Sequence, residues 1–435
     1  MTTQISTSLR SLGSPFWRLW TGESITSFGT QLVQFALGVW VYQRTGSVVD
    51  FAGVTVAGLL PQLLVMPIAG NIADRLDRRR VIIAADCVAA LMSVALITLL
   101  WFDRLEVYHL YAFAAVASLT AAFQEPAARA AMGTLLPDDQ LTRASGIFGI
   151  SATTLGIVAP TIAGAMVVSI GLQGVAILDL VTFLIGATLI WKALAHLRPP
   201  AARLNMSFGA VLRDSWRNFR ASLAFFRQST GMSSLFFYTL VQGTLLTLVV
   251  TLAVPLILAN HSPRELGLVL SFAAAGALVG NMLMVVFQSP ERRMLVVLAG
   301  DAVLTLCVAG IGMVDSLFWY CVLEALACCA GSVGASCAFA LWISKVPDDQ
   351  RGSIHVVQDT ALTACSAAVV LSGALLVDKL FEPALAPGQP LAGVADALLR
   401  VQNGRGIAFL FVVSGAIGLG TALWGLAYKP LRNLN

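Results

Sequence analysis

A four-residue motif occurs twice in this chain, 210 residues apart. Residues 137–140 read PDDQ, and residues 347–350 read PDDQ again. A Gly-Asn pair at residues 70–71 recurs at the same offset, at residues 280–281. In a chain of 435 residues, this offset indicates two similar halves that fold into related arrangements.

Composition places both halves in a membrane. Hydrophobic residues make up 57% of the chain, charged residues only 11%, and the mean hydropathy is +0.82, which excludes a soluble globular domain of this length. The apolar runs are far longer than the roughly 10-residue strands of a membrane barrel, so the spanning elements are helices. We expect crossings at 16–43, 49–72, 81–102, 107–132, 143–169, 173–195, 231–258, 266–288, 294–314, 317–343, 354–380 and 404–427.

Twelve crossings put both termini on one side of the membrane, and the positive charges indicate which side. With the N-terminus in the cytoplasm, 21 of the 27 Lys and Arg residues fall in cytoplasmic segments. Residues 1–15 lack the apolar core of a cleavable signal peptide. We therefore expect an all-α, multi-pass protein of the cytoplasmic (inner) membrane with both termini in the cytoplasm.

The longest cytoplasmic connection joins the two halves. Residues 196–230 carry six Arg among apolar residues at helical intervals, which predicts an amphipathic linker that contacts anionic lipid headgroups rather than nucleic acid. The predicted domains are an N-terminal six-helix lobe at 1–195, this linker at 196–230 and a C-terminal six-helix lobe at 231–435. The outer connection at 381–403 is expected to hold a short helix at 391–400.

Signals for catalysis or cofactors are missing from the sequence. The seven Cys all fall in expected crossings and form no spaced ligand set, so we predict no metal and no disulfide. No His/Asp/Glu cluster, nucleotide-binding loop or nucleophile with a base indicates an enzyme. A sensor or scaffold is disfavoured because no soluble domain is appended. Without a nucleotide site, an ion gradient must supply the energy of any transport.

The sharpest motif follows the second crossing, where residues 70–80 read GNIADRLDRRR. It resembles the GxxxDRxGRR loop of the major facilitator superfamily and occurs at the expected cytoplasmic position. Asp77 departs from that pattern, which usually has Gly there. The resemblance implies twelve helices in two pseudo-symmetric lobes, latched together on the inside. By that resemblance the gate residues are Gly70, Asp74, Arg75, Arg78 and Arg79.

The fifth crossing carries a second family-like motif. Gly156, Pro160 and Gly164 are spaced four apart, which puts small residues on one helix face and allows close approach of a neighbouring helix. The segment is similar to the antiporter motif of family members that export drugs in exchange for protons, although ordinary helix packing is the alternative. Further segments at 21–29, 123–127, 136–139 and 404–408 look like the branch that contains macrolide and enterobactin (siderophore) exporters.

Proton coupling requires a group that titrates inside the membrane. A charged residue at the centre of a spanning helix costs about 2.5 to 3.5 kcal/mol, so it is usually functional. Glu23 is the first candidate and Glu324 the second, because no cation lies within one turn of either and their helices line the cavity in the family. Glu125 follows, with a possible partner in Arg129. The alternative for these groups is a protonated carboxyl that is hydrogen-bonded between helices.

Other intramembrane carboxylates are expected to be structural. Asp86 and Asp301 lie near basic cytoplasmic loops and are predicted to form ion pairs with them, and Asp179 lies on a helix that faces away from the cavity in the family. The fourth crossing has no charged residue between Tyr111 and Gln124. It therefore lacks the Arg that drug exporters of the family often carry there.

The lining of the cavity is expected to come from crossings one, four, seven and ten. Aromatic and neutral polar groups there suit amphiphilic or cationic molecules of moderate size. The predicted function is proton-coupled export of an amphiphilic drug, siderophore, peptide or secondary metabolite by alternating access. An importer or a lysolipid flippase of the same fold is the alternative. The predicted cavity residues are Ser27, Gln31, Gln34, Phe35, Gln124, Phe237 and Gln242.

Overall fold

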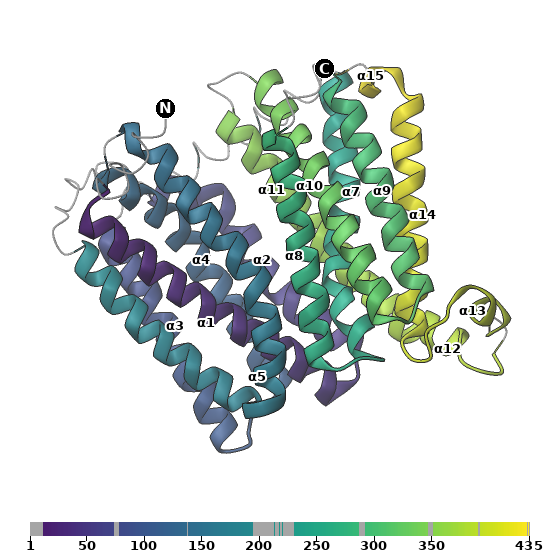
Figure 1. Ribbon diagram of the computed structural model, residues 1–435, viewed down its shortest axis with the longest axis horizontal. Coiled ribbons are helices and arrows are strands. Elements are labelled where there is room, and N and C mark those ends of the chain that lie inside the picture. The colour runs from purple at the N-terminus through teal and green to yellow at the C-terminus, as the bar shows by residue number, and fades with distance from the viewer. Residues whose placement is uncertain are drawn as a thin grey trace.

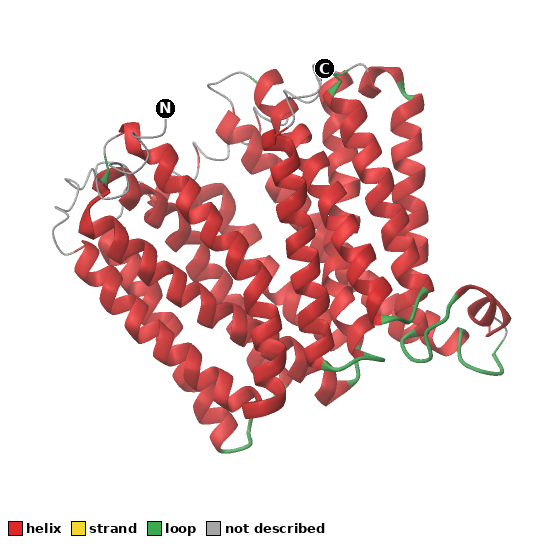
Figure 2. Ribbon diagram, viewed as in Figure 1, coloured by secondary structure: helices red, strands yellow, loops and turns green. Residues whose placement is uncertain are grey.

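The structure is a computed structural model that describes residues 12–73, 78–136, 138–194, 213, 217, 220, 230–286, 292–346, 351–389, 392–432 and 434. These residues form helices joined by short loops, and none of them belongs to a strand (Figure 2). Helices satisfy their backbone hydrogen bonds within one segment, as lipid requires. The predicted all-helical membrane fold is confirmed.

The described residues between 12 and 194 form five helices. Helix α5 includes two crossings, because its backbone is non-helical at Gly171, with φ 67° and ψ −179°. Ser151 hydrogen-bonds to Ser24, and Ile190 contacts Gly22, so segments before and after Gly171 both lie beside the same part of α1. The chain therefore reverses at Gly171. The helices are α1 (Gly13–Thr45), α2 (Val48–Ala73), α3 (Arg78–Trp101), α4 (Val107–Leu135) and α5 (Asp138–Leu194).

The second half begins with α7 (Thr230–Leu258), α8 (Pro263–Val286), α9 (Arg293–Met313) and α10 (Leu317–Lys345). Helix α11 (Arg351–Leu376) continues through a π-helical turn, η2 (Val377–Phe381), into the short α12 (Glu382–Ala384). Helix α13 (Ala392–Leu398) confirms the short helix predicted in the outer connection. The chain ends with α14 (Arg405–Ala427) and α15 (Lys429–Arg432).

The twelve predicted crossings are present. Ten segments of the described chain are long and apolar enough to span a membrane, and one of them, residues 143–194, contains two crossings. Helix α1, with 33 residues, supplies the remaining one. The predicted linker helix lies outside the described residues apart from isolated positions, so the domain limits stay a prediction.

The helices pack in two groups, α1–α5 and α7–α15, which we call the first and second lobes (Figure 1). We call the end at which α1 begins and α14 ends the proximal end, and the opposite end the distal end. The lobes contact each other mainly through α5 against α8 and α2 against α11. Their helices diverge toward the proximal end (Figure 1). Among the described residues, the hydrogen bonds between lobes lie in the distal half.

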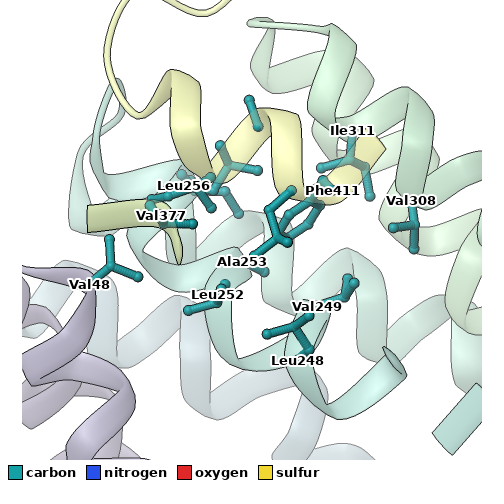
Figure 3. Packing of buried hydrophobic residues seen from close by; sticks show 14 of the residues in the cluster. Val48, Leu248, Val249, Leu252, Ala253, Leu256, Val308, Ile311, Val377 and Phe411 are labelled. Atoms are coloured by element: carbon teal, nitrogen blue, oxygen red, sulfur yellow. The ribbon is translucent and has the colours of Figure 1, made fainter. Parts of the chain in front are cut away.

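Apolar burial reinforces the distal contact. The large buried cluster in the second lobe also contains Val39, Val48, Ala52 and Val56 of the first lobe. Figure 3 shows Val48 and Val377 within this cluster, and their residues are only 4% and 0% exposed. The two lobes therefore share one hydrophobic core at the distal end.

Candidate functional site

Helix α1 has a packed face and a polar face. The packed face is pressed against the second half of α5, where a Cβ on Gly22 would lie 2.9 Å from the carbonyl oxygen of Gly186. Because successive residues of a helix are rotated by about 100°, Ser27, Gln31 and Gln34 lie roughly opposite that face. These three residues are half-buried or exposed. The orientation of α1 is compatible with their predicted place along a substrate path.

Glu23 lies on α1 between these two faces. Its Oε1 atom is buried, and no group in the described part of the chain donates a hydrogen bond to it. Asp86 on α3 is close enough to interact with it electrostatically. A buried carboxyl oxygen without a donor is unfavourable when ionised. The surroundings of Glu23 therefore suit a group that holds a proton in one step and releases it in another.

Two other carboxylates, the buried Asp86 and the half-buried Asp301, have neutral partners. The Gln124 amide donates to Oδ1 of Asp86 at 2.9 Å, and the Tyr238 hydroxyl donates to Oδ2 of Asp301 at 2.6 Å. We expected arginines of the cytoplasmic loops in these positions. The sequence did not indicate these neutral donors, which adjacent helices supply because both carboxylates point into a lobe. Some of the loop arginine side chains lie outside the described residues, so the ion pairs stay a prediction. Gln124, predicted to line the cavity, is accordingly turned toward α3.

The surroundings of Asp179 fit its predicted structural role only in part, because its Oδ1, like Oε1 of Glu23, is buried without a donor among the described residues. Its Oδ2 accepts a hydrogen bond from the Ser93 hydroxyl on α3 at 2.7 Å. Its side chain also faces α1, since a Cβ on Gly29 would lie 3.1 Å from its Oδ1. Asp179 thus links three segments of the first lobe from a buried position.

Gln242 on α7 points toward α14. Its Nε2 donates to the carbonyl oxygen of Gly418 and to the hydroxyl of Thr421, each at 3.0 Å. This side chain therefore packs within the second lobe instead of lining a space between lobes. Phe237 is 63% exposed. Phe35 packs against the apolar clusters of both lobes and so lies at their boundary.

The second and third proton-site candidates differ from Glu23. Glu324 on α10 interacts electrostatically with Cys307 of α9 and with Cys328, one turn along its own helix. Cys307 is part of the buried core, so Glu324 lies against the interior of the second lobe. The side chain of Glu125 lies outside the described part of the structure.

A cavity of about 280 Å³ opens between α3 and the second half of α5. Asp86, Cys87, Phe183 and Trp191 contribute to its wall. Trp191 is 52% exposed, which places this opening on the outer surface of the first lobe. The predicted cavity residues do not line it, so it is distinct from the expected path between the lobes.

The motif in the fifth crossing lies at the contact between lobes. A Cβ on Gly164 would collide with the carbonyl oxygen of Pro263 on α8, and a Cβ on Gly267 would collide with that of Pro160. Gly156 also faces α8, where a Cβ on it would be in ordinary van der Waals contact with the Ala274 side chain. The small residues therefore allow α5 and α8 to pack backbone against backbone.

The predicted gate lies at the proximal end. Gly70 is in the last turns of α2, and Arg78 and Arg79 begin α3. Asp74 and Arg75, and the side chains of the other three gate residues, lie outside the described residues. The latch stays a prediction.

Two polar contacts between lobes were missed in the sequence. Thr161 on α5 contacts Ser271 on α8, and Asp378 in η2 accepts hydrogen bonds from the start of α2. Thr161 lies inside the antiporter-like motif, which was a signal for the first contact. Asp378 follows a long apolar run without any pattern that indicates its partner.

The profile of the Major Facilitator Superfamily matches residues 19–375. The chain belongs to the major facilitator superfamily. It is a multi-pass membrane transporter and not an enzyme, and the match is consistent with the two lobes, the twelve crossings and the loop after α2.

Comparisons with individual proteins agree with this family. Macrolide efflux protein A of Streptococcus pyogenes is 24% identical over 379 residues, which cover 84% of this chain and 90% of that protein. Multidrug efflux pump Tap of Mycolicibacterium fortuitum is 33% identical over 137 residues, 30% of this chain and 33% of that one. The crystal structure of the nucleoside transporter NupG covers 95% of this chain, and 98% of its own, with a TM-score of 0.68 and 13% identity, and so supports the fold. The predicted resemblance to drug and macrolide exporters is confirmed.

Proposed function

We propose that this transporter exports amphiphilic small molecules, such as a drug, siderophore, peptide or secondary metabolite, in exchange for protons. Glu23 carries the proposal, because its carboxyl group lies on a spanning helix with one buried oxygen that lacks a donor among the described residues. The polar face formed by Ser27, Gln31 and Gln34 lies on the same helix. Similarity to a macrolide efflux protein over 84% of the chain supports export and this substrate class.

The proposed orientation follows from charge. With both termini in the cytoplasm, 21 of 27 Lys and Arg residues are cytoplasmic, and the proximal end faces the cytoplasm of the cell. The divergence of the lobes toward that end then corresponds to a pathway open to the inside (Figure 1). The arginine-rich linker at 196–230 would lie on anionic headgroups at the same surface.

Transport then alternates between two orientations of the lobes. With the proximal end open, Glu23 releases its proton to the cytoplasm and the substrate binds. With the distal end open, the substrate leaves and Glu23 takes up one proton from outside. Asp74, with the arginines at 75, 78 and 79, closes the proximal end in that second orientation. The substitution Asp74→Asn should weaken transport without unfolding the protein, and undiminished flux would remove the latch from the proposal.

The deciding experiment measures efflux of amphiphilic dyes and antibiotics, macrolides included, from cells that express the wild type or Glu23→Gln. Each strain is assayed with and without a protonophore. The exposed Glu106 gives a matched control, because Glu106→Gln removes the same charge outside the helices. The proposal is supported if the protonophore abolishes efflux by the wild type, and if Glu23→Gln abolishes efflux whereas Glu106→Gln does not. Protonophore-sensitive efflux that survives Glu23→Gln would move the proton site to Glu324 or Glu125.

Import, or flipping of a lysolipid, is the alternative for the same fold. The direction of flux separates the two functions. Accumulation of a compound in expressing cells, driven by the same gradient and without efflux of any panel member, would favour import.

A further inference from the structure

Asp378 of the second lobe holds the beginning of α2 in the first lobe. Its Oδ2 accepts hydrogen bonds from the Ser47 hydroxyl at 3.0 Å and from the Val49 amide at 3.0 Å. Its Oδ1 accepts one from the Val48 amide at 3.3 Å. One carboxylate therefore receives three hydrogen bonds from the other lobe.

Local structure in the first lobe presents these donors. Helix α1 ends at Gly46, whose φ of 64° lies in the left-handed region and whose amide bonds to the Tyr42 carbonyl. Only Gly46 and Ser47 separate α1 from α2. The Ser47 hydroxyl accepts a hydrogen bond from the Asp50 amide at 3.1 Å, as an N-cap does. The first amides of a helix have no acceptor within it, and the positive end of its dipole favours a carboxylate.

The neighbouring carboxylate in the same segment points the other way. Glu382 accepts a hydrogen bond from the Gly406 amide, at the start of α14, at 2.6 Å. Helix α14 belongs to the second lobe, so this contact stays within one lobe. The segment of η2 and α12 thus caps one helix in each lobe. Both carboxylates lie near Tyr42 of the first lobe, but of the two Asp378 is the one that accepts hydrogen bonds from that lobe.

Buried apolar side chains flank the crossing contact, which is itself partly buried. Val48 and Val377 are both in the shared buried cluster (Figure 3). Hydrogen bonds to an ionised acceptor are about twice as strong as neutral ones. Separation of the lobes at the distal end requires all three bonds to break.

We propose that Asp378 is the distal gate of this transporter, a carboxylate of one lobe that closes the outer end of the pathway by capping the first helical turn of α2 in the other. Its role in a transport cycle rests on the proposed alternating-access function. The geometry itself does not depend on the substrate or on protons. An experiment that follows opening, instead of transport, therefore separates failure of this gate from failure of the proposed exporter.

The test is a distance measurement by pulsed electron paramagnetic resonance on the full chain in lipid nanodiscs. Spin labels are attached at positions 104 and 316, which are exposed at the distal ends of the first and second lobes, after the seven native cysteines are replaced. Asp378→Ala should raise the ratio of distally open to distally closed molecules by about tenfold. Asp378→Asn keeps one acceptor oxygen and should give a smaller rise in the same direction.

Glu382→Ala is the matched control, because it removes a helix-capping carboxylate from the same segment, also near Tyr42, whose hydrogen bond to Gly406 stays within one lobe. It should leave the distance distribution at the wild-type value. A wild-type distribution in Asp378→Ala would overturn the gate, and so would an equal shift in Glu382→Ala. If Asp378→Ala does not fold, Asp378→Asn decides, since an unchanged distribution in that variant also overturns the proposal.

Discussion

The hydroxyl oxygens of Thr161 on α5 and Ser271 on α8 lie 2.6 Å apart across the boundary between the lobes. Ser271 also donates to the Ile157 carbonyl, and Thr161 lies 3.4 Å from the Gly267 carbonyl. Hydrogen bonds between membrane helices are favourable where small residues let the backbones approach. The α5 and α8 pair is therefore a polar contact built on glycines, in the distal half where the lobes meet.

Gly164→Val should damage this contact. A Cβ on Gly164 collides with the Pro263 carbonyl oxygen, whereas a Cβ on Gly156 would lie 3.8 Å from the Ala274 side chain. We expect Gly164→Val to lower the free energy of unfolding by about 1 to 3 kcal/mol, as overpacking does, and to reduce efflux at equal expression. Gly156→Ala should resemble the wild type. Thermal unfolding in detergent and an efflux assay check both variants, and equal effects of the two would contradict the close approach.

Gly171→Ala should destabilise the turn within α5. The φ of 67° with ψ of −179° lies in a region open essentially to Gly alone, and residues forced there lose about 1 to 3 kcal/mol. The control is Gly149→Ala in the same helix, where a Cβ meets nothing within 4 Å. Ala is the better helix former, so this control should be neutral or stabilising by up to about 1 kcal/mol. Melting temperatures of the purified variants should fall for Gly171→Ala and stay unchanged or rise for Gly149→Ala.

Gln242→Leu and Gln31→Leu should affect different quantities. Loss of the Gln242 amide leaves the Gly418 carbonyl without that donor, which should cost about 1 kcal/mol of stability and leave the apparent KM for substrate unchanged. Gln31 lies on the polar face of α1, so Gln31→Leu should change KM with little loss of stability. Substrate titrations beside melting curves separate the two. A raised KM in Gln242→Leu would return that residue to the substrate path.

Tyr238→Phe should reduce stability without reducing transport per folded molecule. The substitution removes the hydroxyl that donates to Asp301, leaving a half-buried acceptor without this partner at a cost of about 1 kcal/mol. Tyr108 is 64% exposed, so Tyr108→Phe is a control with almost no expected change. Unfolding curves give the stability, and efflux normalised to folded protein gives the function. Lost efflux with unchanged stability would make Asp301 functional instead of structural.

The crossings could be predicted from sequence because lipid imposes a strict rule. About 20 apolar residues are needed for each helix, and the duplicated motif indicated that the halves correspond. The direction of a single polar side chain could not be predicted in this way. An error of one residue in helix placement rotates a side chain by about 100°, and Gln124 and Gln242 both turn into their own lobes.

Contacts between lobes were still harder to predict. Asp378 and Ser47 are 331 residues apart, and neither lies in a motif that indicates the other as its partner. Asp86 was assigned to the loop arginines because they are near in sequence, whereas the amide of Gln124 is near in space. The antiporter-like motif did mark a close helix contact, but its partner, α8, required the structure.

The two-residue connection between α1 and α2 joins the helix that carries Glu23 to the helix turn at the distal gate. Since only Gly46 and Ser47 separate the helices, the end of α1 lies next to the first turn of α2, which Asp378 holds. We expect a molecule that displaces the polar face of α1 to move the same turn of α2 that Asp378 holds.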